Sequence, residues 1–319
     1  PKSRWGLTAS LVIWAIGLMS TAPSPIRVLL WSPKGSGLQY GGPGMSAYRL
    51  YSKASPDQFE ITLAHGYVGQ EPYPLFRAQH LIHPMTGSAW SQYRFITAGR
   101  RWLDRHWREL DVFHGLQGFE LTASPAWHAH QLGLPAVVKL AAHQSDLADK
   151  QGWKRLLALP RRRRERLKQI GAVIAISKAI ADELREYGFP EEKIAQIPNG
   201  VDTDQFRPVA SSEERELLRA QRGWRNVPTI LFVGGLVRRK RPHLLVEAMG
   251  LLKQQGHDCQ LVLAGPEHEP EYSAELRRRI ESLGLSDRVV FEGFTADVSP
   301  LYRASDIFSL PSANEGMPN

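Results

Sequence analysis

Cysteine is nearly absent from this sequence, and its scarcity excludes two kinds of stabilising chemistry. Cys259 is the single cysteine among 319 residues, so the chain can form neither an internal disulfide nor a zinc site built from clustered cysteines. Such scarcity agrees with a reducing compartment. The sequence also lacks an obvious acidic pair of the kind that supplies nucleophile and acid in hydrolases. A two-carboxylate hydrolase is therefore not indicated.

The composition is that of a folded protein with more than one domain. Hydrophobic residues make up 42% and charged residues 23% of the chain, a balance that argues against wholesale disorder. A chain of 319 residues is also too long for one ordinary hydrophobic core, so we expect two domains.

The formal net charge of +8 is unevenly distributed along the chain. The stretch 153–170 contains one acid, Glu165, and eight cations: Lys154, Arg155, Arg161, Arg162, Arg163, Arg164, Arg166 and Lys168. Interleaved apolar residues give it the pattern of a basic amphipathic surface, interrupted at Pro160. Three interpretations fit: a solvated helix face, peripheral contact with anionic lipid headgroups, and nucleic-acid binding. The last has the least support because no recognition module surrounds the stretch.

The N-terminal segment 1–22 permits two interpretations. Lys2 and Arg4 precede an uncharged stretch, and Ser20-Thr21-Ala22 resembles a small-residue cleavage site. The pattern is typical of a signal peptide or of a marginal membrane anchor. The chain does not start with Met, so we expect a fragment or a processed start.

From Ile26 onward, short apolar runs alternate with helical patterns. Continuous runs of Val, Ile, Leu and Ala indicate parallel strands covered on both faces. The expected strands are 26–31, 59–65, 112–114, 136–143, 172–177 and 193–197, and the expected helices are 45–54, 96–110, 125–132 and 178–187. Repeated strand, helix, strand units predict a doubly wound α/β domain.

A second series of the same kind follows and is incomplete at the end of the chain. Its expected strands are 229–233, 260–264, 289–292 and 307–310, and its helices are 243–255, 272–283 and 299–304. A polar joining segment runs from 198 to about 225. We therefore expect one domain over 23–207 and another over 208–319, facing across a cleft at the carboxyl ends of both sheets, where ligands bind in this architecture.

A glycine-rich loop follows the first expected strand and contains Gly41 and Gly42. Glycine lets the backbone approach a ligand closely, and the helix start behind the loop favours a phosphate. The loop is not the dinucleotide fingerprint, because the turn is too long and no acid follows the second strand at the expected place. Structural flexibility explains the glycines equally well.

Two histidines end expected strands of the first domain. His143 closes the apolar strand 136–143, where a polar side chain would point into the expected cleft. A core histidine bonded to a carbonyl group is the alternative. His114 has the same placement, and the core interpretation suits it better.

In the second domain, cations follow a strand and a glycine turn. Arg238, Arg239 and Lys240 come soon after Gly234, where Lys could act on a phosphate as a point charge and Arg could bind two oxygens. Surface cations at the start of the next helix are the plain alternative. Glu315 favours the ligand site, because it follows a neighbouring strand of the same sheet and could accept hydrogen bonds from sugar hydroxyls.

The stretch 194–208 resembles the signature that precedes the hinge in retaining GT-B glycosyltransferases of group 1. The stretches 234–240, 263–266, 290–294 and 304–316, the Gly41–Gly42 loop and the strand ending at His143 are also similar to that family. The resemblance spans residues 26–319 in order. It implies two Rossmann-like domains facing each other, the second incomplete because of a C-terminal truncation.

The resemblance implies that a nucleotide-diphosphate sugar binds mainly to the second domain and an acceptor mainly to the first. It places His143 and Glu315 in the catalytic site: His143 near the reacting sugar, and Glu315 as the first of the family's paired glutamates. The implied donor-binding residues are Gly41, Gly42, Arg238, Arg239, Lys240, Gly293, Phe294, Gly316 and Met317. Gly235 stands where the family usually has an arginine, and the second glutamate would fall at position 323, past this chain.

The resemblance further implies transfer with retention of anomeric configuration, without a metal or another cofactor. Preorganised cations and a helix terminus would stabilise the leaving diphosphate. We expect a cytoplasmic enzyme of polysaccharide or glycolipid biosynthesis, with a glycan or lipid-linked acceptor, peripheral membrane contact through 153–170, and no nucleic-acid partner. The main alternative is a non-catalytic module that binds a nucleotide or a partner, which Gly235 and the missing second glutamate favour. A basic nucleic-acid-binding protein is a weaker third hypothesis.

Overall fold

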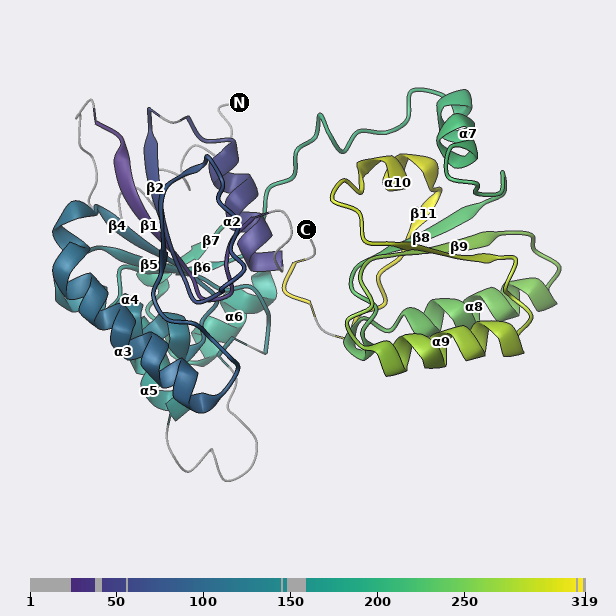
Figure 1. Cartoon of the computed structure of the whole chain (residues 1–319). Coiled ribbons are helices and arrows are strands. Elements are labelled where there is room, and N and C mark those ends of the chain that lie inside the picture. Colours follow the sequence, from purple (N-terminus) through teal and green to yellow (C-terminus); the bar gives the residue numbers. More distant parts are fainter. Residues whose placement is uncertain are drawn as a thin grey trace. The chain divides into compact units, whose positions relative to one another are not determined.

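The computed structural model describes residues 24–37, 42–55, 57–144, 146–147, 159–313 and 315–317. They form two compact units (Figure 1): the first runs to Gly200 and includes Gly316 and Met317, and the second spans Val201–Glu315. Each unit is a parallel β-sheet with helices on both faces, so the expected α/β fold class is confirmed. The N-terminal segment 1–22 lies outside the described residues.

The first unit is built on a seven-stranded parallel sheet with the order β3-β2-β1-β4-β5-β6-β7. Its strands are β1 (Ile26–Ser32), β2 (Phe59–His65), β3 (Phe76–Leu81), β4 (Val112–Leu116), β5 (Ala136–Lys139), β6 (Ala172–Ala175) and β7 (Ile194–Gln196). Chain order reverses between β1 and β4. In doubly wound sheets, the loops that leave the strands at such a reversal diverge and leave room for a ligand.

Helices cover both faces of this sheet. The faces are covered by α2 (Gly42–Ser52) on one side and by α3 (Ala89–His106), α4 (Glu120–Gln131), α5 (Leu159–Gln169) and α6 (Lys178–Glu186) on the other. Under α3, the Trp31 ring lies 5.2 Å from Phe95 and 5.7 Å from Phe113, measured between ring centroids. Gly99 makes room for it, since a Cβ there would lie 2.5 Å from the Trp31 ring. These aromatic contacts anchor α3 to the sheet.

The second unit repeats the plan with a four-stranded parallel sheet, order β10-β9-β8-β11. Its strands are β8 (Thr229–Val233), β9 (Gln260–Ala264), β10 (Val289–Gly293) and β11 (Ile307–Phe308). Its helices α8 (Pro242–Gln254) and α9 (Pro270–Ser282) pack on one face, and α7 (Ser212–Ala220) and α10 (Ser299–Ala304) on the other. Here chain order reverses between β8 and β11, so the loops after these two strands define the ligand-binding end.

Two strands differ from the expectation. The strand expected over 136–143 ends at Lys139, because the next free backbone groups bond elsewhere: Asp146 accepts the Ala141 N–H at 2.6 Å, and Gln144 turns the chain with φ 52°. The strand β3 was not expected at all. It is a half-exposed edge strand with polar residues, and it lacks the continuous apolar run that marks the central strands.

Several helices also differ. The helices expected over 96–110 and 125–132 start earlier, since α3 spans Ala89–His106 and α4 spans Glu120–Gln131; the start of α3 is capped by Ser88, which accepts the Ser91 N–H. The joining segment 198–225 contains α7, whose start is capped by Ser211 accepting the Glu214 N–H at 3.3 Å and which packs beside α10. In the basic stretch 153–170, α5 starts at Leu159, so Pro160 falls in its first turn, where no helical N–H is needed. The interruption expected at Pro160 is not tested, because residues 153–158 lie outside the described residues.

Candidate active site

Two cations and one carboxylate meet at the ligand-binding end of the second sheet. Arg239 and Lys240 belong to a 3₁₀ turn, Arg238–Lys240, that follows β8, and Glu315 follows β11. Glu315 Oε1 lies 3.1 Å from Arg239 Nη1 and 3.2 Å from Lys240 Nζ. The structure thus brings together three of the predicted site residues, in a group that we call the Lys240–Glu315 cluster (Arg239, Lys240 and Glu315).

The tight backbone turns beside this cluster depend on glycine. Gly234 has φ 153° and lies against Lys240, whose Cδ and Nζ would both be 3.0 Å from a Cβ at that position. Gly265, with φ 145°, lies so close that its Cβ would come 2.1 Å from the Gly234 carbonyl oxygen. Arg241 adopts the left-handed region with φ 52°, which costs free energy for a residue with a side chain and is common at functional sites. The turns aim the Lys240 side chain back across the end of β8.

The charges around Glu315 favour the ionised form of its carboxylate. Burial alone would raise the pKa of Glu315, but Lys240, the Ser312 side chain and Arg239 outweigh it, so the net pKa lies below its usual value. The Glu315 side chain retains 25% exposure. An anionic ligand could therefore reach Lys240 and Arg239 and compete with Glu315 for them.

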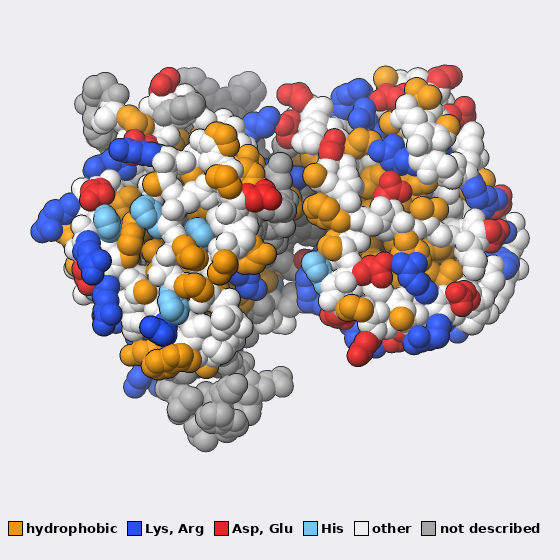
Figure 2. Space-filling view, in the orientation of Figure 1, with side chains coloured by type: hydrophobic (Ala, Val, Ile, Leu, Met, Phe, Trp, Pro, Cys, Tyr) orange, Lys and Arg blue, Asp and Glu red, His pale blue; other side chains and the backbone are white. Residues whose placement is uncertain are grey.

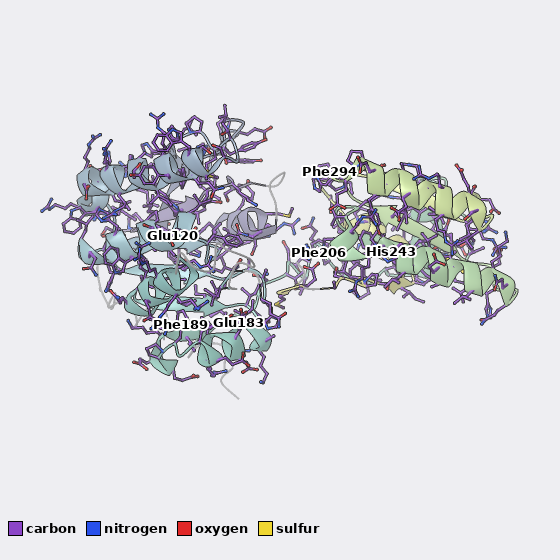
Figure 3. All side chains as sticks on the ribbon, turned by 90° about the horizontal axis from the view of Figure 1, so that it is seen from below. Glu120, Glu183, Phe189, Phe206, His243 and Phe294 are labelled. Atoms are coloured by element: carbon purple, nitrogen blue, oxygen red, sulfur yellow. The ribbon has the colours of Figure 1, made fainter. Side chains whose placement is uncertain are left out.

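The other predicted residues of the second domain are not part of this cluster. Arg238 extends to α9, where it pairs with Glu275 at 2.5 Å and lies over the Tyr272 ring at 5.0 Å. Gly293 ends β10 with φ 72° and accepts the Gly265 N–H at 2.7 Å. Phe294 (labelled in Figure 3) follows it and is 59% exposed.

Three further predicted positions have distinct placements. Gly316 and Met317 group with the first compact unit. A Cβ at Gly235 would lie 2.8 Å from His268 Cδ2 and 3.7 Å from the Pro266 carbonyl oxygen, so a larger residue there would require His268 to move.

In the first unit, Gly42 is the first residue of α2, and Gly41 lies outside the described residues. His143 is half-buried and lies in the turn after β5, four residues beyond Lys139 rather than at the strand end. Two buried carboxylates hold this turn: Asp146 Oδ2 accepts the Ala141 N–H at 2.6 Å, and Glu183 Oε2, on α6 (Figure 3), accepts the Gln144 N–H at 2.9 Å. Burial raises the pKa of Asp146, against the lowering effect of backbone N–H groups that it accepts. Side-chain hydrogen bonds to Asp146 and Glu183 therefore fix the backbone of the turn that carries His143.

Lys139 is a residue that sequence reasoning did not single out. It ends β5, is largely buried, and donates to Ser46 Oγ on α2 at 2.9 Å; Ser46 in turn lies 3.3 Å from Asn199 Oδ1. Burial lowers the pKa of Lys139 to about 8. A buried ammonium without a carboxylate partner is a common feature of functional sites. The signal was present in the sequence, since a lone Lys in an apolar, doubly covered strand is unusual.

His114 is a buried core histidine, as its sequence position favoured. Its Nδ1 lies 2.7 Å from the Tyr51 hydroxyl on α2, and the residue is 5% exposed. Burial, with a smaller effect from Lys139, lowers the pKa of His114 to about 3, so the ring stays neutral. The pairs Ser46–Lys139 and Tyr51–His114 place polar contacts between α2 and the sheet.

Much of the cationic charge of α5 is used within the fold. Arg163 is buried, Arg164 lies over the Tyr187 ring at 4.4 Å, Arg166 pairs with Glu120 (Figure 3), and Lys168 pairs with Glu165 at 2.9 Å. Arg161 and Arg162 remain exposed, and residues 153–158 lie outside the described part of the chain. The solvated-face and lipid interpretations of 153–170 therefore concern fewer cations than the sequence suggested.

Searches of the described residues give two further facts. No helix among them combines the length and the apolar character needed to cross a membrane. They also contain no group of three or more His, Cys, Asp or Glu side chains that could hold a metal ion.

Comparison with protein families settles the relationship of the chain. The model of Glycosyltransferase Family 4 matches residues 40–205, more than half of the chain, and that of Glycosyl transferases group 1 matches residues 214–319. The chain belongs to the group 1 glycosyltransferase family. The resemblance drawn from the motifs is thus confirmed, with one family model over each half.

The curated relatives of this glycosyltransferase match it in part. Mannosylfructose-phosphate synthase of Agrobacterium fabrum is 35% identical over 151 residues, which are 45% of this chain and 33% of the relative. D-inositol 3-phosphate glycosyltransferase of Xylanimonas cellulosilytica is 33% identical over 150 residues, 45% of this chain and 36% of the relative. The chain thus matches about a third of the length of these relatives.

Solved structures support the fold. HepE of Anabaena in complex with UDP has a TM-score of 0.69 and 20% identity, over 90% of this chain and 74% of that chain. WaaG, a glycosyltransferase involved in lipopolysaccharide biosynthesis, has a TM-score of 0.64 and 20% identity, over 90% and 75% of the two chains. These neighbours are GT-B glycosyltransferases, which agrees with two Rossmann-like units.

Proposed function

We propose that this protein transfers a sugar from a nucleotide-diphosphate sugar to a glycan or lipid-linked acceptor, with retention of anomeric configuration. The donor binds mainly to the second unit, and the acceptor mainly to the first. The enzyme works in the cytoplasm, where nucleotide sugars are available, in polysaccharide or glycolipid biosynthesis. Family membership supports the reaction class, and the site residues below support the chemistry.

The observation that carries this proposal is the Lys240–Glu315 cluster. Its cations come from the loop after β8 and its carboxylate from the loop after β11, the two loops that flank the reversal of strand order. When a glycosyl bond to a diphosphate breaks, negative charge develops on the leaving oxygens. Lys240 and Arg239 would stabilise that charge as it forms, because they are already held in place. Displaced from them by the diphosphate, Glu315 could accept hydrogen bonds from sugar hydroxyls.

These cations allow the departure of the diphosphate without a metal or another cofactor in the proposed reaction. A carboxylate nucleophile is not required either, because one oxygen of the leaving phosphate can accept the proton of the acceptor hydroxyl. The acceptor then attacks from the face that the diphosphate leaves, which retains the configuration. Gly316, Met317, Gly293 and Phe294 complete the donor site in this proposal.

The first unit supplies the acceptor side. The turn bearing His143 is held by Asp146 and Glu183, and Lys139 ends the strand just before it. A half-buried imidazole on a fixed turn can orient a sugar hydroxyl without loss of conformational freedom at the moment of reaction. Gly42, the first residue of α2, and Gly41, which precedes it in the sequence, would make close backbone contacts with the donor in this proposal.

Turnover of a labelled nucleotide sugar by the purified chain tests the proposal. A thermal-shift screen of nucleotide diphosphates and their sugars first identifies the donor, since a ligand that binds only the folded state raises the melting temperature. With that donor, Lys240→Met should lower kcat/KM by about 100-fold or more, the size of effect expected when a preorganised charge is removed from a leaving group. Arg278→Gln is the matched control, because Arg278 is an exposed cation on α9.

The outcomes separate an enzyme from a binding module. A melting-temperature rise that Lys240→Met abolishes, without any turnover in the unmodified chain, would support the non-catalytic alternative. Equal losses of kcat/KM in Lys240→Met and Arg278→Gln would contradict the assignment of the Lys240–Glu315 cluster to the donor site.

A further inference from the structure

Helix α3 has an exposed face of arginines without acidic partners. Arg94, Arg101 and Arg105 are spaced by seven and four residues, which places them on one side of an α-helix together with Trp90. All three arginines are exposed, and no carboxylate in the described part of the chain pairs with them. Asp104, the single acid of α3, instead accepts from His128 on α4 at 2.7 Å. The positive charge of this face is therefore available to a partner.

Exposed aromatic and aliphatic side chains flank the start of the same face. Trp90 is 66% and Tyr93 57% exposed, and their rings stack with centroids 5.6 Å apart. Tyr67 and Val68 are also exposed, and they lie nearby, because Met85 just before α3 donates its N–H to the Gly66 carbonyl at 2.9 Å. Exposed large apolar residues gathered in this way mark an interaction surface.

A pocket opens between the arginines and the edge strand β3. It has a volume of about 400 Å³ and is lined by Gln79, His80, Ile82, Arg101, Trp102 and Arg105 among others. The rings of His80, Trp102 and His106 form a cluster, with centroids 5.1 Å apart for His80 and Trp102, 4.6 Å for Trp102 and His106, and 6.3 Å for the two histidines. The pocket thus combines aromatic and aliphatic side chains with two arginines in its lining.

We propose that this surface, the α3 face (Trp90, Tyr93, Arg94, Arg101 and Arg105), docks onto a membrane of anionic phospholipid. Figure 2 shows Lys, Arg and apolar side chains gathered over the part of the first unit where α3 lies in Figure 1. Guanidinium groups bind phosphate oxygens in pairs, and aromatic rings with one polar edge are favoured at the boundary between headgroups and acyl chains. The pocket accommodates one headgroup, held by Arg101 and Arg105. Charge complementarity favours an anionic lipid surface over other partners, because its headgroups attract the arginines and its interfacial region accommodates the Trp90–Tyr93 pair.

The contrast with α5 sharpens this inference. Arg163, Arg164, Arg166 and Lys168 of α5 are engaged in the fold, whereas Arg94, Arg101 and Arg105 of α3 have no acidic partner in the described residues. Membrane contact through α3 goes beyond the transfer reaction and does not depend on it, so it can be tested without a substrate.

Co-sedimentation of the full chain with lipid vesicles tests the proposal. We expect binding to phosphatidylcholine vesicles that contain phosphatidylglycerol, little binding to phosphatidylcholine alone, and weaker binding as salt rises. Arg94→Gln, Arg101→Gln and Arg105→Gln together should weaken binding by about 100-fold, from about fivefold for each cation. Trp90→Ala with Tyr93→Ala should weaken it by about tenfold. The control is Arg161→Gln with Arg162→Gln on α5.

Three results would overturn the proposal. The α5 control could lose as much binding as the α3 triple variant, which would assign the membrane contact to 153–170. The chain could bind neutral and anionic vesicles equally. Finally, it could prefer duplex DNA to anionic vesicles, with the α3 variants weakening both, which would make nucleic acid the partner of this face. Unchanged thermal unfolding of each variant shows that a loss of binding is not a loss of fold.

Discussion

At the carboxyl end of the second sheet, Glu315 pairs with two cations, whereas at the same end of the first sheet the acids Asp146 and Glu183 accept from backbone N–H groups. The cation at that end of the first sheet, Lys139, donates to the Ser46 hydroxyl. The comparison shows two roles for carboxylates: Glu315 can be replaced at its cations by a ligand anion, whereas Asp146 and Glu183 stabilise the fold. A ligand anion can replace Glu315 at the cations of the second unit. In the first unit, the loss of either carboxylate would leave a part-buried hydrogen bond without its acceptor, and Lys139 has no carboxylate partner among the described residues.

The largest effect on stability should come from the first unit. Asp146→Ala removes a buried carboxylate and leaves the part-buried Ala141 N–H without its acceptor, and we expect the free energy of unfolding to fall by about 2 to 3 kcal/mol. Urea denaturation measures the change. Asp182→Ala is the matched control, because Asp182 forms exposed ion pairs with Lys178 and Arg185, and its removal should cost much less. Similar losses in the two variants would mean that Asp146 has no special structural role.

A gain in stability is expected at Lys139. Because burial lowers its folded-state pKa to about 8, the folded protein carries an unfavourable ammonium below that pH, and stability should rise as pH increases from 8 toward the usual Lys pKa. Lys139→Met should therefore stabilise the protein by about 1 to 2 kcal/mol at pH 7, a value discounted for partial exposure. The gain should shrink near pH 10. Denaturation at both pH values measures it, and a loss of stability at pH 7 would contradict the unfavourable burial.

The smallest of these changes should come from the Lys240–Glu315 cluster. The pKa of Glu315 is lowered in the folded state, so its ionisation stabilises the fold above its unfolded-state pKa, and this contribution is lost as pH falls through the folded-state pKa. Glu315→Gln should reduce the free energy of unfolding by about 1 kcal/mol at pH 7 and much less near pH 3. Saturating both chains with a nucleotide diphosphate should make the difference at pH 7 smaller, because the diphosphate displaces Glu315 from the cations. A larger difference would contradict this displacement.

Sequence reasoning predicted the elements whose burial follows from their own composition. The strands 26–31, 59–65, 229–233 and 260–264 lie within or match β1, β2, β8 and β9, because apolar residues dominate each of these short stretches. It missed β3 and α7, which are half-exposed elements stabilised by a neighbour rather than by their own pattern. The convergence of Lys240 and Glu315 was predictable, since both follow parallel strands of one sheet.

The sequence by itself determined that this chain is a group 1 glycosyltransferase with two parallel α/β units, because strand composition and motif order are properties of the chain alone. Only the tertiary structure decided how each cation is used. Neighbouring residues such as Arg238 and Arg239 turn to different partners, α9 in one case and Glu315 in the other. Arg163, Arg164 and Arg166 of α5 lie against the fold, whereas Arg94, Arg101 and Arg105 of α3 face outward. The partner of each cation depends on how elements distant in sequence pack together, and a local sequence pattern carries no information about that packing.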